Sequence, residues 1–227
     1  MAQYVIATTK SWNIQNSERL MARFPEDSFC LITDKEKLTY ELLVKLKPRY
    51  VFFPHWSWII PAEIYENYEC IVFHMTDLPF GRGGSPLQNL LVRGIYETKV
   101  SAIRVEAGLD TGPVYLKAPM DISEGSADDI LRMISDMIFE EMIPQFLKGE
   151  LVPYPQEGEV VSFKRRTPNQ SEIPGGLTQR QLYDYIRMLD GEGYPAAYRD
   201  CGDFRIHFRN AQWKEDTVIA EAEFKEI

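Results

Sequence analysis

A histidine and an aspartate occupy the positions in this sequence that are best suited to acid–base chemistry. His74 ends an apolar run that begins at Cys70, and a loop with three glycines follows it up to Pro86. Asp110 lies between two glycines in the turn 106–113. A histidine and a carboxylate held in one site can move protons at neutral pH. His74 alone has an ordinary alternative as a hydrogen-bonded core residue, and the glycines could serve a tight turn, so the interpretation rests on the pair.

The elements that would position these side chains alternate between strands and helices. Short apolar runs predict strands, and amphipathic stretches between them predict helices. The expected strands are residues 4–7, 29–32, 51–53, 70–74 and 99–105, and the expected helices are 17–24, 38–46, a helix opening at Pro61, and 86–93. This order predicts an α/β fold with a mostly parallel, twisted sheet. Ligands of such sheets bind beyond the carboxyl ends of the strands, so we expect the loops after Phe53, His74 and Val105 to lie at one edge.

The rest of the chain predicts one more helix, a linker and a small tail. Ser126–Asp129 has the residues of a capped helix start, and apolar residues at helical spacing continue to Phe146. Residues 151–176 are rich in proline, glycine and polar side chains, which is typical of a linker. A capping box at Thr178–Gln181 opens a further helix, and strands are expected at 204–208 and 218–224. The sequence therefore predicts a main domain in residues 1–150, a linker in 151–176 and a small C-terminal α+β unit in 177–227.

The loop after His74 and the turn 106–113 both resemble motifs of the folate-dependent formyltransferase family. Its members have a histidine followed by a Leu-Pro-x-x-Arg-Gly-x-x-Pro loop and, further along, a Leu-Asp-x-Gly-Pro turn. The matching residues here are Leu78, Pro79, Arg82, Gly83 and Pro86 after His74, and Leu109, Asp110, Gly112 and Pro113 in the turn. Residues 165–168 and 186–195 look like stretches that follow the catalytic domain in sugar-amine and initiator-tRNA formyltransferases. The resemblance implies a Rossmann-like formyltransferase domain, similar above all to sugar N-formyltransferases of surface-polysaccharide and nonulosonic acid biosynthesis.

The resemblance also implies a reaction, a cofactor and a set of site residues. The formyl group of 10-formyltetrahydrofolate would pass to an amine, with tetrahydrofolate released and no metal involved. Asp110 would hold His74 in place, and His74 would polarise the formyl group and assist proton transfer. The residues expected to bind the cofactor are Trp58, Ile59, Ile60, Arg82, Gly83, Glu106, Ala107, Gly108 and Leu109. The residues expected to bind the acceptor are Thr76, Asp77, Gly81, Gly84 and Ser85.

One position departs from the family pattern. The family usually has an asparagine two residues before the histidine, where it donates a hydrogen bond to the oxyanion, and this chain has Val72 there. Loss of one such donor costs roughly 2.7–4 kcal/mol in barrier height. We expect His55, which follows the neighbouring strand, to compensate as a third catalytic residue; the alternative is a structural role in closing the loop over the pterin. Thr76 or Asp77 would act on the acceptor side.

Composition and charge restrict the partners and the location. The chain has 227 residues, a formal net charge of −9 and three cysteines without a C-x-x-C pair. Net negative charge disfavours nucleic acid as a partner. Without an export signal or a long apolar run, we expect a cytoplasmic protein that does not contact membranes, and the cysteine spacing predicts no metal site. The tail helix, with Tyr183, Tyr185 and Ile186, could form a homodimer surface or pack on the main domain.

Three functions therefore stay open. The first is N-formylation of a nucleotide-linked amino sugar, such as a 4-amino-4,6-dideoxyhexose on UDP or dTDP. The second keeps formyl transfer and changes the acceptor to methionyl-tRNA, glycinamide ribonucleotide or water. The third is a folate-binding or regulatory protein in which Val72 marks the loss of transferase activity. Replacing His74 or Asp110 distinguishes an enzyme from a folate-binding protein. In an enzyme either replacement should abolish turnover, whereas a folate-binding protein should still bind folate when Asp110 is replaced.

Overall fold

The computed structural model describes residues 2–227, whose contacts form two compact units. The first unit comprises the described residues up to Arg82 together with Lys99–Pro119 and Arg132–Ser162. The second unit comprises Gly83–Thr98, Met120–Leu131 and Phe163–Ile227. Each unit joins segments that are distant in the sequence, so tertiary packing rather than chain order sets its limits. The division of the chain at residues 150 and 177 stays a prediction.

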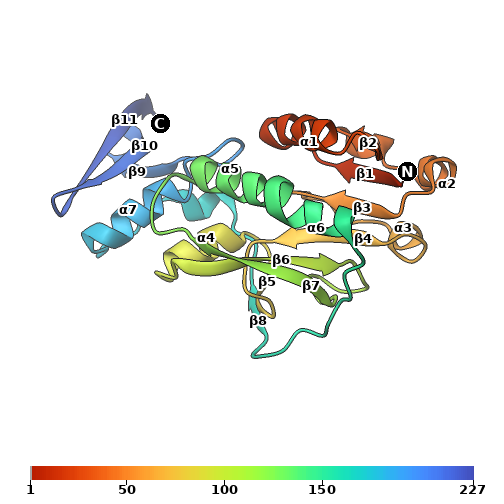
Figure 1. Cartoon of the computed structure of the whole chain (residues 1–227). Helices are drawn as coiled ribbons and strands as arrows, with labels where there is room; N and C mark the ends of the chain where they lie inside the picture. The colour runs from red at the N-terminus through yellow and green to blue at the C-terminus, as the bar shows by residue number, and fades with distance from the viewer. Residues whose placement is uncertain (1) are drawn as a thin grey trace. The chain divides into compact units, whose positions relative to one another are not determined.

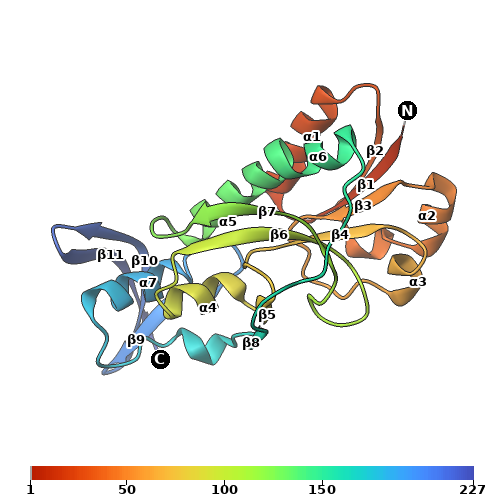
Figure 2. The same cartoon turned by 60° about the horizontal axis from the view of Figure 1, so that its bottom comes forward.

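A mostly parallel sheet forms the centre of the first unit. Its strands lie in the order β2-β1-β3-β4-β6-β7. Their bounds are β1 Gln3–Ala7, β2 Ser28–Ile32, β3 Tyr50–Phe53, β4 Cys70–His74, β6 Glu97–Arg104 and β7 Val114–Asp121. The first four strands are parallel, as predicted, whereas β6 is antiparallel to β4, with Ser101 opposite His74. Figure 2 shows β6 and β7 side by side at this end of the sheet.

The direction of β6 corrects one prediction. The loop after Val105 does not leave the sheet at the same edge as the loops after Phe53 and His74, because β6 ends beside the start of β4. The connection between β4 and β6 contains strand β5 (Phe80–Gly83) and the short helix α4 (Pro86–Val92). Parallel pairing usually uses one crossover helix, whereas this connection is divided between a strand and a short helix.

Alternate residues of β3 face two different layers, as the pleat of a strand requires. Val51 and Phe53 belong to a core that includes side chains of α2 (Tyr40–Leu46) and α3 (Ala62–Tyr65). Tyr50 and Phe52 face Phe146 of α6 (Ile143–Lys148), with ring centroids 5.4 Å apart in both pairs. Helix α1 (Ser11–Arg23) packs beside the helical turn that precedes α6 (Figure 1). Both faces of the sheet are thus covered, as in other α/β folds.

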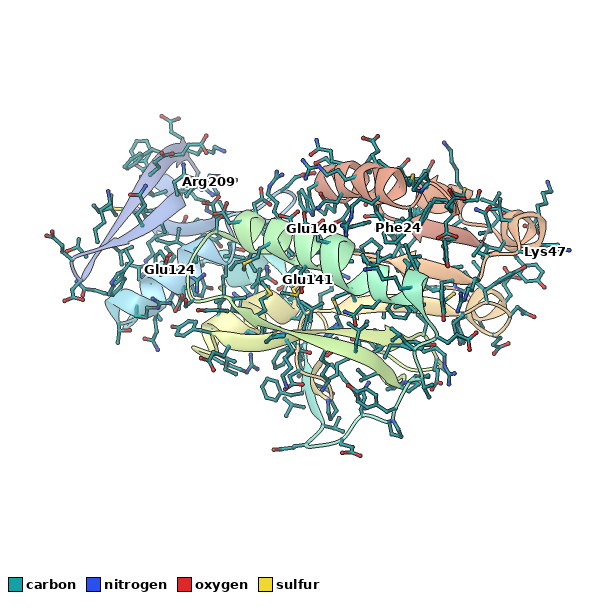
Figure 3. The ribbon with its side chains drawn as sticks, viewed as in Figure 1. Phe24, Lys47, Glu124, Glu140, Glu141 and Arg209 are labelled. Carbon is teal, nitrogen blue, oxygen red and sulfur yellow. The ribbon has the colours of Figure 1, made fainter. Side chains whose placement is uncertain are left out.

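The helix predicted over residues 126–146 is interrupted. It consists of α5 (Ala127–Met137), a π-helical turn (Ile138–Met142) and α6. Pro144 accounts for the interruption, because proline lacks an amide hydrogen and its ring clashes with the carbonyl group four residues earlier. That carbonyl belongs to Glu140, which is exposed with Glu141 on the outer side of the turn (Figure 3). The predicted cap is confirmed, since the amide of Asp129 donates to Oγ of Ser126 at 3.2 Å.

The second unit combines α4 and α7 (Gln179–Arg187) with a three-stranded antiparallel sheet. The sheet contains β9 (Ala197–Cys201), β10 (Phe204–Lys214) and β11 (Thr217–Glu226), so the two predicted tail strands are confirmed and are longer than expected. The capping box of α7 is also confirmed, because Thr178 and Gln181 each accept a hydrogen bond from the other's backbone amide. Gln88 of α4 donates to the carbonyl of Met188 at 3.1 Å, which holds the two helices together.

A few short elements complete the chain. Two 3-10 helices span Lys35–Lys37 and Pro168–Ser171. Strand β8 (Val161–Phe163) pairs with β5 in a two-stranded sheet that the sequence did not predict. Within residues 2–227, we find no helix with the length and apolar character needed to cross a bilayer.

Candidate active site

His74 is the last residue of β4, and only 9% of its side chain is exposed. Its Nε2 atom lies 2.8 Å from the carbonyl oxygen of Gly81. A carbonyl oxygen can only accept, so Nε2 carries a hydrogen and donates it. Nδ1 lies 3.5 Å from Oδ2 of Asp110, roughly 0.5 Å longer than an ideal N–H···O hydrogen bond. The first unit therefore brings the two residues of the predicted pair together.

Asp110 reaches His74 from a turn that starts at the far end of β4. Its backbone has a φ of 55°, a left-handed conformation that is unfavourable for most residues with a side chain. The side-chain amide of Gln156 donates to the carbonyl oxygens of Asp110, at 2.9 Å, and of Gly112, at 2.7 Å. Gly112 cannot carry a side chain, because a Cβ atom there would lie 1.8 Å from the carbonyl oxygen of Arg104. Close packing of the turn thus explains the glycine in the second motif.

Gln156 joins the two motif loops, and sequence reasoning missed it. Its Oε1 atom accepts hydrogen bonds from Nε and Nη2 of Arg82, at 3.1 and 2.7 Å, while its Nε2 atom holds the Asp110 turn. Arg82, which the sequence assigns to the cofactor, is therefore engaged within the protein. Gln156 lies in the segment predicted as a linker, and no local pattern marks it, because its partners are 44 to 74 residues away in the chain.

Thr76 and Asp77, both predicted on the acceptor side, follow His74 closely in the chain and are themselves bonded. Thr76 is buried, and its hydroxyl donates to the carbonyl oxygen of Gly81 at 3.4 Å. The carboxylate of Asp77 forms ion pairs with Lys99, at 3.0 Å, and with Lys117, at 2.5 Å. Burial alone would raise the pKa of Asp77, but the hydrogen bonds and charges of the two lysines outweigh it and hold this pKa below its ordinary value. A cationic acceptor would have to compete with these lysines for Asp77.

His55 lies in the loop after β3 with a φ of 51°. Its Nδ1 atom is 3.1 Å from Nδ2 of Asn13. Oδ1 of Asn13 accepts from the hydroxyl of Ser135 at 2.6 Å, which leaves the amide nitrogen to face His55. Burial and then the positive charge of Lys10 lower the pKa of His55 to about 4, so the ring is neutral at pH 7. Since Nδ1 accepts, the single ring hydrogen is on Nε2, which is buried and finds no partner among residues 2–227.

Two exposed loops of the first unit carry most of the other residues assigned to the cofactor. Trp58 is 40% exposed, Ile59 84% and Leu109 60%, so both loops present surface to solvent. The remaining members of the second loop, Glu106, Ala107 and Gly108, are exposed as well. Ile60 differs, because its side chain is buried in the core beside α3 and only its backbone could meet a ligand.

The glycine-rich loop has a packing role. In the second unit, a Cβ atom on Gly83 would lie 2.4 Å from the carbonyl oxygen of Phe163, and one on Gly84 would lie 2.6 Å from Cβ of Arg165. The hydroxyl of Ser85 accepts from the amide of Arg166 at 3.0 Å. Close packing therefore requires glycine at both positions. Their assignment to cofactor and acceptor stays a prediction.

Val72 packs among apolar side chains, and its own side chain has no polar atom that could bind a substrate. Its neighbours include Leu78, Ile103 and Val114 on one side and the core beneath α2 and α3 on the other. Val72 and His74 are two residues apart on β4, so both point to the same face of the sheet. The site therefore has its imidazole and its carboxylate but no side-chain amide at this position.

Known proteins have sequences related to this chain. The sequence pattern of the methionyl-tRNA formyltransferase C-terminal domain matches residues 168–225. The methionyl-tRNA formyltransferase of Thermodesulfovibrio yellowstonii is 29% identical over 170 residues, which cover 72% of this chain and 54% of that protein. The chain thus spans about half the length of this curated relative.

Solved structures give a match over the full chain. A methionyl-tRNA formyltransferase from Clostridium thermocellum is 50% identical, and the match covers 100% of both chains with a TM-score of 0.95. A sugar N-formyltransferase from Shewanella sp. is 15% identical and covers 92% of this chain and 97% of that one with a TM-score of 0.72, which shows a shared fold and leaves a closer kinship to the sugar enzymes unconfirmed. Identity of 50% along two complete chains, together with the His74–Asp110 pair, shows that the chain belongs to the folate-dependent formyltransferase family.

Proposed function

We propose that this chain transfers the formyl group of 10-formyltetrahydrofolate to the nitrogen of an amine. The observation that carries the proposal is the pair formed by His74 and Asp110, with Nδ1 and Oδ2 held 3.5 Å apart. The related proteins are formyltransferases, which are folate-dependent one-carbon transferases, and this supports both the reaction class and the cofactor.

The described residues fit a folate. A pterin is flat and carries both donors and acceptors, and the exposed loops around Ile59 and Leu109 offer it surface. The buried Nε2–H of His55 has no acceptor among residues 2–227, and a carbonyl group on a ligand would supply one. When bound, 10-formyltetrahydrofolate provides the formyl carbon that the amine attacks.

Proton transfer is the task of His74. As the amide bond forms, the amine loses a proton, and the departing folate nitrogen gains one. An imidazole can carry this proton at neutral pH, and the carboxylate of Asp110 stabilises the positive charge that the ring acquires meanwhile. In the structure Nε2 of His74 donates to the carbonyl of Gly81, so substrate binding must replace that carbonyl as its partner.

Methionyl-tRNA is the acceptor that we propose first. Methionyl-tRNA formyltransferase is the name both of the relative at 29% identity and of the structure at 50% identity described above. An amino sugar on a nucleotide is the second candidate. The formal net charge of −9 favours it, because phosphates of a large nucleic acid would be repelled overall.

The experiment is a formyl-transfer assay that measures tetrahydrofolate release with three acceptors: methionyl-tRNA, a UDP-linked amino sugar and a dTDP-linked amino sugar. Turnover with one acceptor identifies the substrate class. His74→Ala and Asp110→Ala should each lower kcat by about 10²–10⁴-fold, which is the usual contribution of a positioned acid–base group. The matched control is His207→Ala, since His207 lies on β10 in the second unit.

Each outcome separates two hypotheses. Turnover that survives in both His74→Ala and Asp110→Ala would refute the assigned chemistry. Tight folate binding by the wild type without turnover on any acceptor would favour the folate-binding protein that Val72 suggests.

A further inference from the structure

His55 presents a buried hydrogen-bond donor that has no acceptor. Its Nε2 atom is excluded from solvent, and residues 2–227 provide no partner for it. A buried donor without a partner loses its hydrogen bonds to water and gains none in return, so such groups are rare in folded proteins. A ligand that brings an oxygen acceptor to this point would restore a hydrogen bond. The orphaned Nε2–H group is therefore evidence for a ligand atom beside His55.

A chain of hydrogen bonds fixes which nitrogen of His55 carries the hydrogen. Asp136 and Ser135 accept from the amide of Asn16 at 2.8 and 2.9 Å. The hydroxyl of Ser135 then donates to Oδ1 of Asn13 at 2.6 Å, and Nδ2 of Asn13 lies 3.1 Å from Nδ1 of His55. Nδ2 of Asn13 also donates to Oγ1 of Thr8 at 2.8 Å and faces the carbonyl oxygen of Pro54 at 3.1 Å. An amide nitrogen cannot accept, so Nδ1 of His55 carries no hydrogen where it faces Asn13. The chain holds the tautomer in which Nε2–H is the donor.

The position of His55 places this donor near the proposed chemistry. Phe53, two residues before His55, is paired with Val72, two residues before His74. Strands β3 and β4 are parallel and neighbouring strands lie about 4.8 Å apart, so the two histidines follow adjacent strand ends at the same edge. Val72 is apolar, and Nε2 of His74 already donates to Gly81. Among these residues, His55 alone has a side-chain donor without a partner.

We propose that Nε2–H of His55 donates a hydrogen bond to the formyl oxygen, with Asn13 as the residue that positions it. The inference rests on the proposed function. In the reaction the bond from the amine nitrogen to the formyl carbon forms, the bond from that carbon to the folate nitrogen breaks, and a proton passes from the amine to the folate nitrogen through His74. His55 keeps its hydrogen throughout and stabilises the negative charge that gathers on the oxygen. A pKa of about 4 agrees with this role, because a neutral ring donates without titrating near pH 7.

The first test compares two amides at this position. A glutamine amide reaches the place of Nε2, whereas an asparagine amide reaches only the place of Nδ1. We expect His55→Asn to lower kcat by about 10²-fold, the usual effect of removing one such donor, and His55→Gln to keep kcat within about tenfold of the wild type. The KM for the amine should change less than kcat. Equal losses in the two variants would overturn the inference.

The second test restores a donor from the neighbouring strand. Val72 shares a face of β4 with His74, so Val72→Asn places a side-chain amide at the same edge. We expect the double variant His55→Asn with Val72→Asn to have a kcat at least about tenfold above that of His55→Asn alone. His207→Asn is the matched control for loss of a histidine, since it lies in the second unit. A folded double variant with no gain, judged by circular dichroism and thermal melting, would contradict a donor role.

A binding measurement separates this inference from the proposed function. Dissociation constants for 10-formyltetrahydrofolate and tetrahydrofolate are measured without an acceptor. We expect His55→Asn to lose any preference for the formylated folate while binding tetrahydrofolate as the wild type does; equal weakening for both folates would mean that His55 only shapes the loop. If the wild type binds neither folate, the proposed function itself fails, and the inference fails with it.

The positioning role of Asn13 has a spectroscopic test. Asn13→Asp replaces the donating amide with a carboxylate that can only accept, so Nδ1 of His55 would have to carry a hydrogen. Nitrogen-15 NMR of labelled histidine should show a protonated Nε2 and an unprotonated Nδ1 for His55 in the wild type, and a protonated Nδ1 in Asn13→Asp. The kcat of Asn13→Asp should be lower than that of the wild type. An unchanged tautomer and an unchanged kcat would overturn this role.

Discussion

Replacing Gln156 tests whether one side chain outside both motifs holds the Asp110 turn in place. Gln156 accepts two hydrogen bonds from Arg82 and donates to the carbonyl oxygens of Asp110 and Gly112. Gln156→Ala removes all of these contacts. Gln156→Glu keeps an acceptor for Arg82, but its carboxylate cannot donate to either carbonyl. The two variants together separate the Arg82 contact from the hold on Asp110.

The expected magnitude follows from the contacts that are lost. Each neutral hydrogen bond contributes about 0.5–1.5 kcal/mol, and water can replace part of this because Gln156 is only half-buried. The left-handed backbone of Asp110 stores strain of order 1–3 kcal/mol, which these bonds help to offset. Without them the turn relaxes and the carboxylate moves away from His74. A loss of about 1.4 kcal/mol in the transition state corresponds to a tenfold lower rate, so we expect both variants to lose about tenfold in kcat.

The assay is steady-state formyl transfer at saturating folate, with kcat and KM determined separately. Gln145→Ala is the matched control, because Gln145 is exposed and donates to the carbonyl of Glu141 along its own helix. The control should keep its kcat. If Gln156→Glu keeps full kcat as well, the hydrogen bond from Gln156 to the Asp110 carbonyl does not affect the reaction rate. That result would refute the proposed role of Gln156.

Three further predictions concern stability. Gly112→Ala should lower the free energy of unfolding in urea by about 1–3 kcal/mol and abolish turnover, because its Cβ would collide with the Arg104 carbonyl; an unchanged midpoint would contradict the packing argument. The lysines hold the pKa of Asp77 below its unfolded value of about 3.9, so its stabilisation is present above that pH and is lost as pH falls through the lower folded pKa; Asp77→Asn should flatten this acid limb in urea titrations. The folded pKa of His55 is about 4 against about 6.5 when unfolded, so the unfolded state binds more protons between these values and stability falls with falling pH. His55→Asn should reduce this slope, and equal slopes would show that His55 is charged in the folded state.

Local sequence patterns predicted the strands whose residues are apolar on both faces. In β3, apolar residues on both faces are needed, because Val51 and Phe53 face α2 and α3 while Tyr50 and Phe52 face Phe146. Such runs are visible in the sequence, and the first four strands were found with the correct parallel pairing. The direction of β6 could not be predicted from the sequence, since it depends on the path that the chain takes through β5 and α4 between β4 and β6.

The sequence predicted that His74 and Asp110 lie together, and it did not predict the contacts that hold them. His74 and Asp110 stand in recognisable motifs, but their neighbours contribute through long-range contacts. Gln156 meets the Asp110 carbonyl 46 residues away, and Ser135 meets Asn13 across 122 residues. A single glutamine or serine has no periodicity or motif that would reveal such a contact. Gln156 therefore remained inside a predicted linker until the fold placed it against both loops.

Val72 shows why this difference matters for function. From the motif alone, a valine in place of a donor predicts a weakened or inactive enzyme. The fold places Phe53 opposite Val72 and leaves His55, beyond the end of the next strand, with a buried donor that Asn13 orients. A donor required at one point of a site can come from any strand end that reaches it, because electrostatic stabilisation depends on where the hydrogen lies and not on which residue carries it. Activity in this chain should therefore depend on His55, and an asparagine placed at Val72 should make His55 less necessary.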